Sequence, residues 1–306
     1  MSGLSSQTTD EAKRLRALAR RVAHAYIADG EPRAILLVGS AATGDADWYS
    51  DLDLIVYYDQ VPPDELVAET ARRLGAGRYR GIPWSDDSGE PDERGYGERY
   101  SLDGIECQLG HISVGSFERE IKRVVVDLEP DEELLKIMSG LFEGRPLYGE
   151  ELIADWRRQA DYSERLQRAI IEQRWKFFPW WYYQERLGSR DANVWRYDVL
   201  VQSIYSIVGV LSALNRIYFS TFEFKRASKL LSRLEAAPPN LAARLNTLLE
   251  SDERSAITEL ERLVAETQAL VSDRFPDLDL SLEHGGKPTP PGARESPWTL
   301  PSKPKN

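Results

Sequence analysis

The order of hydrophobic and polar residues changes in character about 130 residues into the chain. Before that point, apolar runs alternate with helical patterns, beginning with a helix predicted from the capping box of Thr8 and Glu11 to about Asp29. The run 34–38 is continuously apolar and ends at a glycine, which predicts a buried strand that opens into a turn. The β-branched and aromatic run 52–58 predicts a second strand. This half therefore has the pattern of a mixed α/β domain.

A hairpin signal follows later in the same half. Asp103-Gly104 favours positive φ at both positions, so the flanking residues 99–102 and 105–108 are predicted as paired strands. The remaining predictions for this half are a helix over 64–74 behind Pro62-Pro63, a mobile loop rich in Gly and charged residues over 75–97, and a helix over 117–126.

Beyond Glu129 the apolar residues recur with a period of 3.6, which is typical of helices that pack in a bundle. The predicted helices cover residues 131–143, 149–160, 162–187, 191–219, 223–236, 239–250 and 252–273. Residues 276–306 are rich in proline and polar residues, which bury too little apolar surface to offset the entropy of ordering the chain. We therefore expect an α+β fold with a mixed-sheet domain over 1–128, a helical bundle over 129–275 and a disordered tail.

Composition narrows the class of partner. The 306 residues carry a net charge of −11, which disfavours a nucleic-acid partner and favours a cationic small molecule. Cys107 is the single cysteine and the three histidines are scattered, so the sequence predicts neither a disulfide nor a His/Cys metal cage. With no signal-peptide pattern and no run of eighteen apolar residues, the expected location is the cytoplasm. The sequence does not indicate an oligomeric state.

Two carboxylates at the start of the second predicted strand have the spacing of a metal site. Asp51 and Asp53 are two residues apart, so they face the same side of the strand and can share a pair of Mg²⁺ ions, with Mn²⁺ as the alternative. Two such cations about 4 Å apart would bridge a triphosphate and an attacking oxygen. Gly39 lets the backbone approach the phosphates, and Ser40 offers its hydroxyl.

The alternative interpretation is that these aspartates are ordinary turn residues. We interpret Asp45-x-Asp47 and Asp277-x-Asp279 in that way, as solvated turns. Asp51 and Asp53 differ because buried strands flank them, and carboxylates at the edge of an apolar sheet are costly without a partner.

The two segments together resemble a known family. Ile35-Leu-Leu-Val-Gly-Ser40, ten further residues and then Asp51-Leu-Asp-Leu-Ile-Val56 resemble the nucleotidyltransferases of the DNA polymerase β superfamily. The resemblance implies metal binding by the two aspartates and ATP or another nucleoside triphosphate as co-substrate. It also implies a third carboxylate on a later strand, as metal ligand or base, and Glu106 matches that position. Glu98 or Asp103 nearby is the alternative for this third acid.

The second half is similar to the helical domain of bacterial small-molecule adenylyltransferases, including the aminoglycoside and lincosamide resistance enzymes. The similarity rests on Leu211-x-x-Leu-Asn-Arg-x-Tyr-Phe219 and on Lys225 in the next segment. It implies that Lys225 reaches the triphosphate across an interdomain cleft and that Asp198, one helix earlier, faces the site. A solvated surface lysine is the alternative for Lys225.

Other conspicuous residues are predicted to be structural. The aromatic run 175–183 is expected to pack in the bundle core, with Pro179 kinking or starting a helix, although such rings could also stack on a substrate. His111 is likewise expected to be structural.

The sequence therefore predicts transfer of AMP from ATP to a hydroxyl of a small, cationic acceptor such as an aminoglycoside-like molecule. One alternative is a catalytically silent nucleotide-binding or antitoxin-like protein that acts through a partner. A second alternative, an RNA- or tRNA-modifying nucleotidyltransferase, needs a basic face that the composition disfavours.

Overall fold

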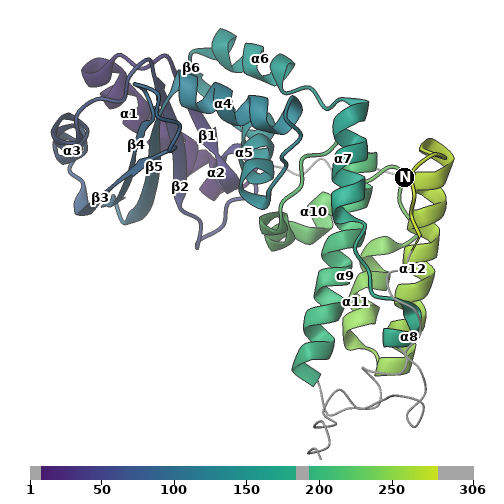
Figure 1. The fold of residues 1–306 in the computed structure, drawn as a ribbon. Coiled ribbons are helices and arrows are strands. Elements are labelled where there is room, and N and C mark those ends of the chain that lie inside the picture. The colour runs from purple at the N-terminus through teal and green to yellow at the C-terminus, as the bar shows by residue number, and fades with distance from the viewer. Residues whose placement is uncertain (1–7, 184–192, 282–306) are drawn as a thin grey trace, which may run out of the picture. The chain divides into compact units, whose positions relative to one another are not determined.

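The computed structural model describes residues 8–183 and 193–281, drawn as ribbon in Figure 1. The chain divides into two compact units. The first comprises the residues up to Ile170 together with the returning segment Ser212–Arg226, and the second comprises Ile171–Leu211 and the residues from Ala227 onward.

The first unit is built around a six-stranded mixed sheet whose strand order is β3-β4-β5-β2-β1-β6. Neighbouring strands are antiparallel, except that β2 and β5 are parallel. The strands are β1 (Ala34–Val38), β2 (Leu52–Tyr58), β3 (Gly77–Ser85), β4 (Arg94–Leu102), β5 (Ile105–Ser113) and β6 (Arg145–Tyr148). The strands predicted over 34–38 and 52–58 are confirmed, and β6 extends the sheet beyond residue 128.

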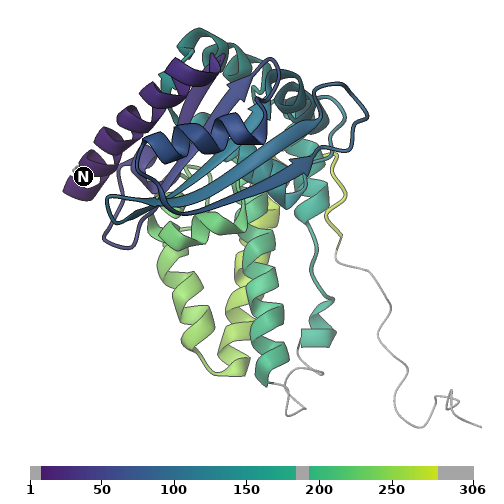
Figure 2. The same ribbon diagram turned by 90° about the vertical axis from the view of Figure 1, so that its left-hand side faces the viewer.

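Helices cover both faces of this sheet (Figures 1 and 2). One face carries α1 (Asp10–Gly30) and α3 (Asp64–Arg73), while the other carries α4 (Val114–Val125), α5 (Glu132–Glu143) and α6 (Glu150–Gln159). The short helix α2 (Gly39–Thr43) links β1 to β2. The predicted mixed α/β architecture is confirmed.

Alternation along β2 separates an apolar face from the face that carries Asp53. Leu52, Leu54 and Val56 are buried in the core that α1 and α3 complete. Tyr57 lies on the opposite face, where its ring centroid is 4.9 Å from that of Phe117 and 4.7 Å from that of Trp156. Because alternate residues of a strand share a face, Asp53 lies on the face of Tyr57.

The predicted hairpin is confirmed. Asp103 and Gly104 have φ values of 52° and 78°, as a two-residue turn of this class requires, and Leu102 pairs with Ile105. The paired strands are longer than the sequence indicated, since pairing continues to Tyr96 and His111.

The loop predicted over 75–97 is wrong for most of its length. Residues Gly77–Ser85 form β3, which pairs with β4 at the edge of the sheet. Its side chains are mostly exposed, so the strand has no apolar alternation to reveal it. Its backbone hydrogen bonds instead depend on a partner strand that local sequence does not show.

The first helix begins one residue later than predicted. Thr9, rather than Thr8, is the N-cap, because its hydroxyl accepts a hydrogen bond from the Ala12 backbone N–H at 3.1 Å. The same hydroxyl donates to the Ala46 carbonyl at 2.7 Å, which ties the start of α1 to the loop that follows α2.

The helical character of the second half is confirmed, but the two units do not divide at residue 128, because the first unit continues to Ile170 and includes Ser212–Arg226. Two of the predicted helices also differ. The helix predicted over 162–187 is interrupted: α7 (Glu164–Arg174) ends before Pro179, and α8 (Trp180–Tyr182) begins directly after it. The helix predicted over 223–236 is instead a 3₁₀ turn, η2 (Thr221–Arg226), followed by α10 (Ala227–Ser232). The remaining helices of this half are α9 (Asn193–Leu214), α11 (Leu241–Glu250) and α12 (Glu253–Arg274).

Within the second unit, α11 and α12 pack side by side (Figures 1 and 2). Arg244 of α11 joins them through ion pairs to Glu259 at 2.5 Å and to both carboxylate oxygens of Glu266 at 2.7 and 2.8 Å. Among the described helices, α9 alone is long and apolar enough to cross a membrane, but 61% of its most apolar window is buried, as in the core helix of a folded domain.

The aromatic run packs mainly against itself and its own unit. The rings of Phe178 and Tyr182 stack at 4.4 Å, and the Trp175 indole N–H donates to the Leu280 carbonyl at 3.0 Å. The disordered tail predicted over 276–306 begins too early, because Leu280 is buried and its carbonyl accepts that hydrogen bond from Trp175. The part of the tail from residue 282 onward lies outside the described residues.

Candidate active site

The two predicted metal-binding aspartates lie where β2 begins. Asp53 is the second residue of β2, and Asp51 immediately precedes the strand. Asp53 pairs in register with Val38 on one side and with Gln108 on the other. Asp53 therefore lies near the start of an interior strand, between β1 and β5.

Gly39 lies directly against the Asp53 carboxylate. It has a φ of +69°, and a Cβ placed on it would lie 2.7 Å from Asp53 Oδ2. Both features require glycine, because other residues rarely adopt this backbone conformation and any side chain would displace the carboxylate. The next residue, Ser40, lies in the first turn of α2, where its carbonyl accepts hydrogen bonds from the N–H groups of Gly44 and Asp45.

Glu106 lies on β5, the strand parallel to β2, and shares a face with Gln108. The Gln108 side-chain amide donates to Asp51 Oδ2 at 2.7 Å and to Glu106 Oε1 at 3.2 Å. Arg99 on β4 forms an ion pair with Glu106 at 3.3 Å and donates to Gln108 Oε1 at 3.2 Å. Gln108 carries no signal in the sequence and was not predicted, yet it links two of the three predicted carboxylates.

The charges around Asp53 have opposing effects on its acidity. Burial, followed by the nearby carboxylates of Asp51 and Glu106, raises the pKa of Asp53 to about 6, and the ammonium groups of Lys136 and Lys225 partly offset this rise. Asp53 therefore lies within electrostatic reach of two acidic and two basic side chains.

The two lysines share one aromatic ring. The ammonium of Lys136, on α5, lies 4.1 Å from the centroid of Phe222, and that of Lys225 lies 5.4 Å from it. Both lysines are exposed, so their charges remain available to a ligand. Lys225 was predicted as a phosphate ligand, whereas Lys136 was missed because it resembles any polar residue on an amphipathic helix.

The turn η2 that carries Lys225 belongs to the same unit as the sheet. Ser139 of α5 donates to Glu223 Oε1 at 2.8 Å, and the Thr221 backbone N–H donates to the Glu132 carboxylate. Arg226 donates to the Asp45 carbonyl and to Asp47 Oδ2, each at 2.9 Å. These contacts fix the returning segment beside the loop that precedes Asp51.

That loop exposes two aromatic side chains. Asp47 closes a turn by accepting hydrogen bonds from the Tyr49 N–H and the Ser50 hydroxyl. The hydrogen bond from Arg226, followed by those from Ser50 and Tyr49, lowers the pKa of Asp47. Trp48 and Tyr49 are 81% and 93% exposed. Asp47 is thus a turn residue as predicted, but it also anchors a loop that exposes two rings two and three residues before Asp51 in the chain.

The alternatives to Glu106 lie elsewhere. Glu98 is buried on the other face of the sheet, where its carboxylate accepts from the Tyr26 hydroxyl at 2.5 Å and lies 2.7 Å from His111 Nε2. Asp103 pairs with Arg21 at the hairpin turn. Because His111 is fully buried in this network and also contacts the Tyr58 hydroxyl, its predicted structural role is confirmed.

Asp198 is not placed with the other candidates. It is exposed near the start of α9, in the second unit, whereas the carboxylates, Gly39, Ser40 and both lysines belong to the first. A role for Asp198 stays a prediction.

The donor set fits a hard divalent cation in part. Asp51 and Asp53 offer oxygen ligands, which Mg²⁺ prefers, and the repulsion that raises the Asp53 pKa is what a cation would relieve. The Glu106 carboxylate is instead bonded to Gln108 and Arg99. Within the described residues, no three His, Cys, Asp or Glu side chains are grouped to hold a metal ion.

Comparison with known proteins agrees with this geometry. Residues 18–104 match the nucleotidyltransferase domain family, a range that includes Gly39, Ser40, Asp51 and Asp53 but not Glu106. No curated protein sequence matches the chain.

Several solved structures are similar to the chain, among them the following three. A nucleotidyltransferase-like protein from Exiguobacterium sibiricum 255-15 is 12% identical over 87% of this chain and 81% of its own, with a TM-score of 0.35. Cid1 in complex with its short product ApU is 13% identical over 67% of this chain, with a TM-score of 0.27. The Cid1 poly(U) polymerase with MgGTP bound is 14% identical over 67% of this chain, with a TM-score of 0.28. The chain spans about half the length of the Cid1 chains, 50% and 51%.

Proposed function

Residues 18–104 form a nucleotidyltransferase domain of the DNA polymerase β-like superfamily, and from this premise we propose that the protein transfers a nucleoside monophosphate from a nucleoside triphosphate, ATP foremost, to a hydroxyl of a small molecule in the cytoplasm. The proposal rests on the side chains that surround Asp53. This residue has Asp51 and Glu106 as acidic neighbours, Lys136 and Lys225 as basic neighbours, and Gly39 in contact with its carboxylate.

The reaction is a displacement at phosphorus. The acceptor hydroxyl oxygen forms a bond to the α-phosphorus while the bond from that phosphorus to the oxygen bridging the α- and β-phosphates breaks. Pyrophosphate leaves with the electron pair of the broken bond, and the hydroxyl proton passes to a carboxylate base.

Asp51 and Asp53 would hold the divalent metal, Mg²⁺ or Mn²⁺, which supplies neutralisation of triphosphate charge when bound. The surrounding side chains would position Asp51 and help to keep Asp53 ionised. The Gln108 amide donates to Asp51, and the two ammonium groups oppose the rise in the Asp53 pKa.

Lys136 and Lys225 would bind the triphosphate itself. Their two positive charges next to the aspartates would orient the β- and γ-phosphates away from the acceptor and stabilise the pyrophosphate that leaves. Gly39 and Ser40 would contact the phosphates from the other side, since glycine lets the backbone come close and the serine hydroxyl can donate.

Glu106 is the proposed base or third ligand. Its carboxylate contacts Arg99 and Gln108, and the same Gln108 side chain also donates to Asp51. To take a proton from the acceptor it would exchange at least one of these partners when substrates bind, and its charge next to Asp51 would also attract an amine.

The acceptor would rest on Trp48 and Tyr49. Exposed aromatic rings pack well on saccharide faces and attract cationic groups, so both features favour an amine-bearing, hydroxyl-bearing acceptor. This loop lies just ahead of Asp51 in the chain and is anchored by Arg226, so bound rings would lie close to the reacting carboxylates.

The proposal is tested by incubating the protein with Mg²⁺, each nucleoside triphosphate in turn, and a panel of aminoglycosides, neutral sugars, anionic metabolites and transfer RNA. We expect pyrophosphate release together with a mass increase of one nucleoside monophosphate on an amine-bearing member. Modification of transfer RNA or of an anionic metabolite alone would contradict the proposed acceptor class while leaving nucleotidyl transfer in place.

A further inference from the structure

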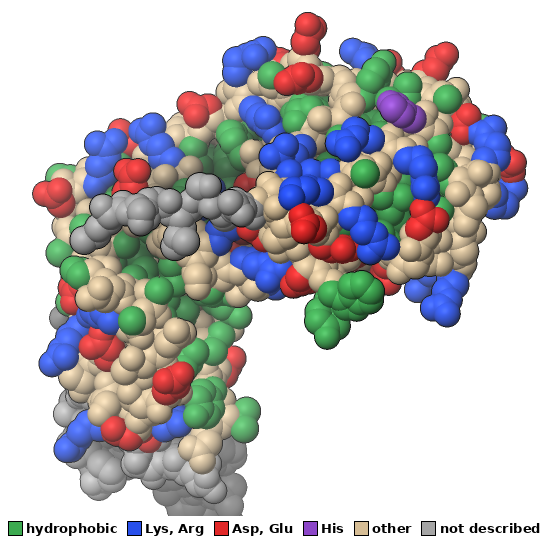
Figure 3. Space-filling view, turned by 180° about the vertical axis from the view of Figure 1, so that it is seen from behind, with side chains coloured by type: hydrophobic (Ala, Val, Ile, Leu, Met, Phe, Trp, Pro, Cys, Tyr) green, Lys and Arg blue, Asp and Glu red, His purple; other side chains and the backbone are tan. Residues whose placement is uncertain are grey.

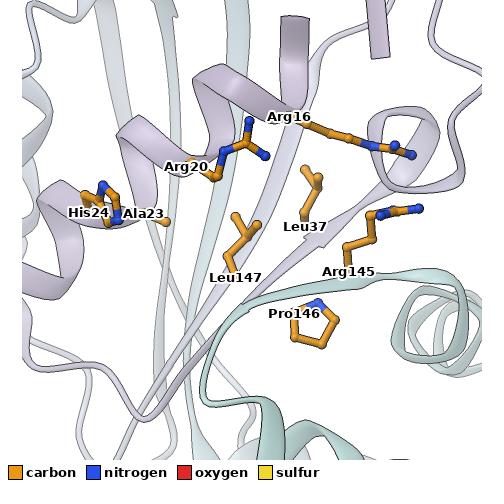
Figure 4. Close-up of a pocket in the computed structure, with 8 residues that line it drawn as sticks. All are labelled: Arg16, Arg20, Ala23, His24, Leu37, Arg145, Pro146 and Leu147. Atoms are coloured by element: carbon orange, nitrogen blue, oxygen red, sulfur yellow. The ribbon is translucent and has the colours of Figure 1, made fainter. Parts of the chain in front are cut away.

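A cavity of about 290 Å³ opens between α1 and β6, on the opposite face of the sheet from Asp53. Arg16, Arg20 and His24 are spaced four residues apart along α1, so they lie on one side of that helix. The side chains that matter here are Arg16, Arg20 and His24 from α1, Leu37 from β1, and Arg145 and Leu147 from β6 (Figure 4).

The cavity carries positive charge that no carboxylate neutralises directly. Within the described residues, none of its three guanidinium groups forms an ion pair, whereas the neighbouring Arg21 pairs with Asp103 at 2.6 Å. Burial together with the charges of Arg145 and Arg20 lowers the pKa of Arg16, and the charge of Asp45 only partly opposes this. Such a cluster is unusual in a chain of net charge −11, and Figure 3 shows Lys and Arg side chains gathered on this face.

Two of the guanidinium groups are held in place by neutral partners. Arg16 donates to the carbonyls of Ala41 and Ala42 at 2.8 and 2.9 Å, and Arg145 donates to the Ala42 carbonyl at 2.9 Å. Carbonyl oxygens satisfy these N–H groups without cancelling the charge. A guanidinium has five N–H donors, so each keeps further donors for an anion.

We propose that this cavity binds a small organic phosphate, with its phosphate group on the guanidiniums of Arg16, Arg20 and Arg145. A phosphate carries up to two negative charges on three oxygens, so it can accept hydrogen bonds from more of the guanidiniums that line this cavity than a single carboxylate can. Leu37 and Leu147 lie between α1 and β6 in Figure 4, and they offer an apolar surface to the organic part of the ligand. The cavity is separate from the candidate active site because the sheet lies between them.

Arg20 is the residue to substitute. Arg16 and Arg145 both hold α2, the helix that begins at Gly39, so changing them would disturb the candidate active site as well. Arg20 is exposed and makes no such contact within the described residues. The matched control is Arg21→Gln, which removes the same charge from the next position of α1.

The test is calorimetric titration of the full chain with phenyl phosphate and, separately, with inorganic phosphate, in EDTA so that no metal takes part. We expect phenyl phosphate to bind more tightly than inorganic phosphate, Arg20→Gln to weaken its binding at least tenfold, and Arg21→Gln to change it less than threefold. Lys225→Met, which alters the candidate active site, should bind phenyl phosphate as the unaltered protein does. Melting temperatures within about two degrees of each other would establish that the variants fold.

Four results would overturn the proposal: no binding of phenyl phosphate, a loss below tenfold in Arg20→Gln, an equal loss in Arg21→Gln, or a comparable loss in Lys225→Met. Inorganic phosphate binding as tightly as phenyl phosphate would overturn the assignment of an organic ligand. None of these results depends on nucleotidyl transfer, so the proposed function can fail or succeed separately.

Discussion

Asp53 is held where its ionised form is disfavoured, with burial and two carboxylates acting against two lysines. If Asp53 served only the fold, this arrangement would lower its stability for no gain, because a neutral residue of the same shape would avoid the repulsion. Local conflicts of this kind are typical of functional sites, where a ligand supplies the missing charge. The residues that create the conflict come from β2, β5, α5 and η2, and only the fold brings them together.

Gly39→Ala should remove activity because the new Cβ would meet the Asp53 carboxylate at 2.7 Å in a backbone conformation of φ +69°. We expect turnover to fall at least a hundredfold, while the φ strain alone destabilises the fold by about 1 kcal/mol. Gly104→Ala is the matched control, since its φ is +78° but nothing lies within 4 Å of the added carbon. Turnover in Gly39→Ala equal to that in Gly104→Ala would contradict the assigned contact.

Lys136→Met and Lys225→Met should each weaken nucleotide binding by about tenfold, since each removes one charge pair with the triphosphate. The measurement is nucleotide affinity by calorimetry. Lys122→Met is the control, because that lysine lies on α4 and pairs with Asp127, just beyond the end of the helix. An effect of Lys225→Met without one of Lys136→Met would limit the phosphate site to the returning segment.

The sequence could identify only those site residues that lie close together in the chain. Gly39, Asp51 and Asp53 fall within fifteen residues and between two apolar strands, so spacing alone predicts a shared face. Gln108 and Lys136 carry no such mark. Gln108 matters only because β5 runs parallel to β2, and Lys136 only because α5 directs it toward Phe222.

At the scale of elements, the loop between α2 and β2 links the two aromatic rings to the site. Trp48→Ala, or Tyr49→Ala, should raise the KM for the acceptor about tenfold and leave nucleotide affinity unchanged, because each ring is exposed and is proposed to contact the acceptor and not the phosphates. Trp84→Ala, which removes a partly exposed ring from the edge strand β3, should change neither. Equal effects of Trp48→Ala on both substrates would show that the loop positions the aspartates instead.

The acidic residues at α4 and the start of α5 predict a pH effect on stability. Burial, and then Glu133, raises the pKa of Glu120 to about 7 from an ordinary value of 4.5. Between these two values the folded protein keeps a proton that the unfolded chain has released, so the free energy of unfolding falls as the pH rises.

Glu120→Gln should therefore reduce this fall. At pH 8 we expect the variant to be more stable than the unaltered protein by at most about 3 kcal/mol, and at pH 4 to differ little from it, as measured by urea unfolding. A variant less stable at pH 8 would show that ionised Glu120 has a favourable partner.

The elements that were not predicted have one property in common. Each is stabilised by partners that lie far away in the sequence. β3 has few buried side chains and exists because β4 supplies its hydrogen bonds. The 3₁₀ turn η2 lies after a long helix and resembles a helix start, yet it is fixed by Ser139, Glu132 and Asp47 from far earlier in the chain. By contrast, the hairpin at Asp103-Gly104 was predictable because its turn chemistry is local.

For the whole molecule, the distribution of charge matters more than its sum. The net charge of −11 hides a basic cavity on one face of the sheet and two exposed lysines beside the carboxylates on the other. Composition therefore predicted a site that repels anions, whereas the structure pairs its acidic residues with cations. The division of the first unit into two chain segments also explains why Lys225 was assigned by sequence to a separate helical domain.

The central claim is that Asp51 and Asp53 form the metal site of a nucleotidyltransferase, and the most direct test is metal-dependent pyrophosphate release. The assay compares the unaltered protein with Asp51→Asn and Asp53→Asn, using nucleoside triphosphate, Mg²⁺ and the acceptor panel, with melting temperature recorded for each. We predict that pyrophosphate release requires Mg²⁺ and falls at least a hundredfold in either variant, while the Asp53→Asn fold is no less stable because one of three clustered negative charges is gone. Release by either variant within tenfold of the unaltered protein, or equal release in EDTA, would contradict the account.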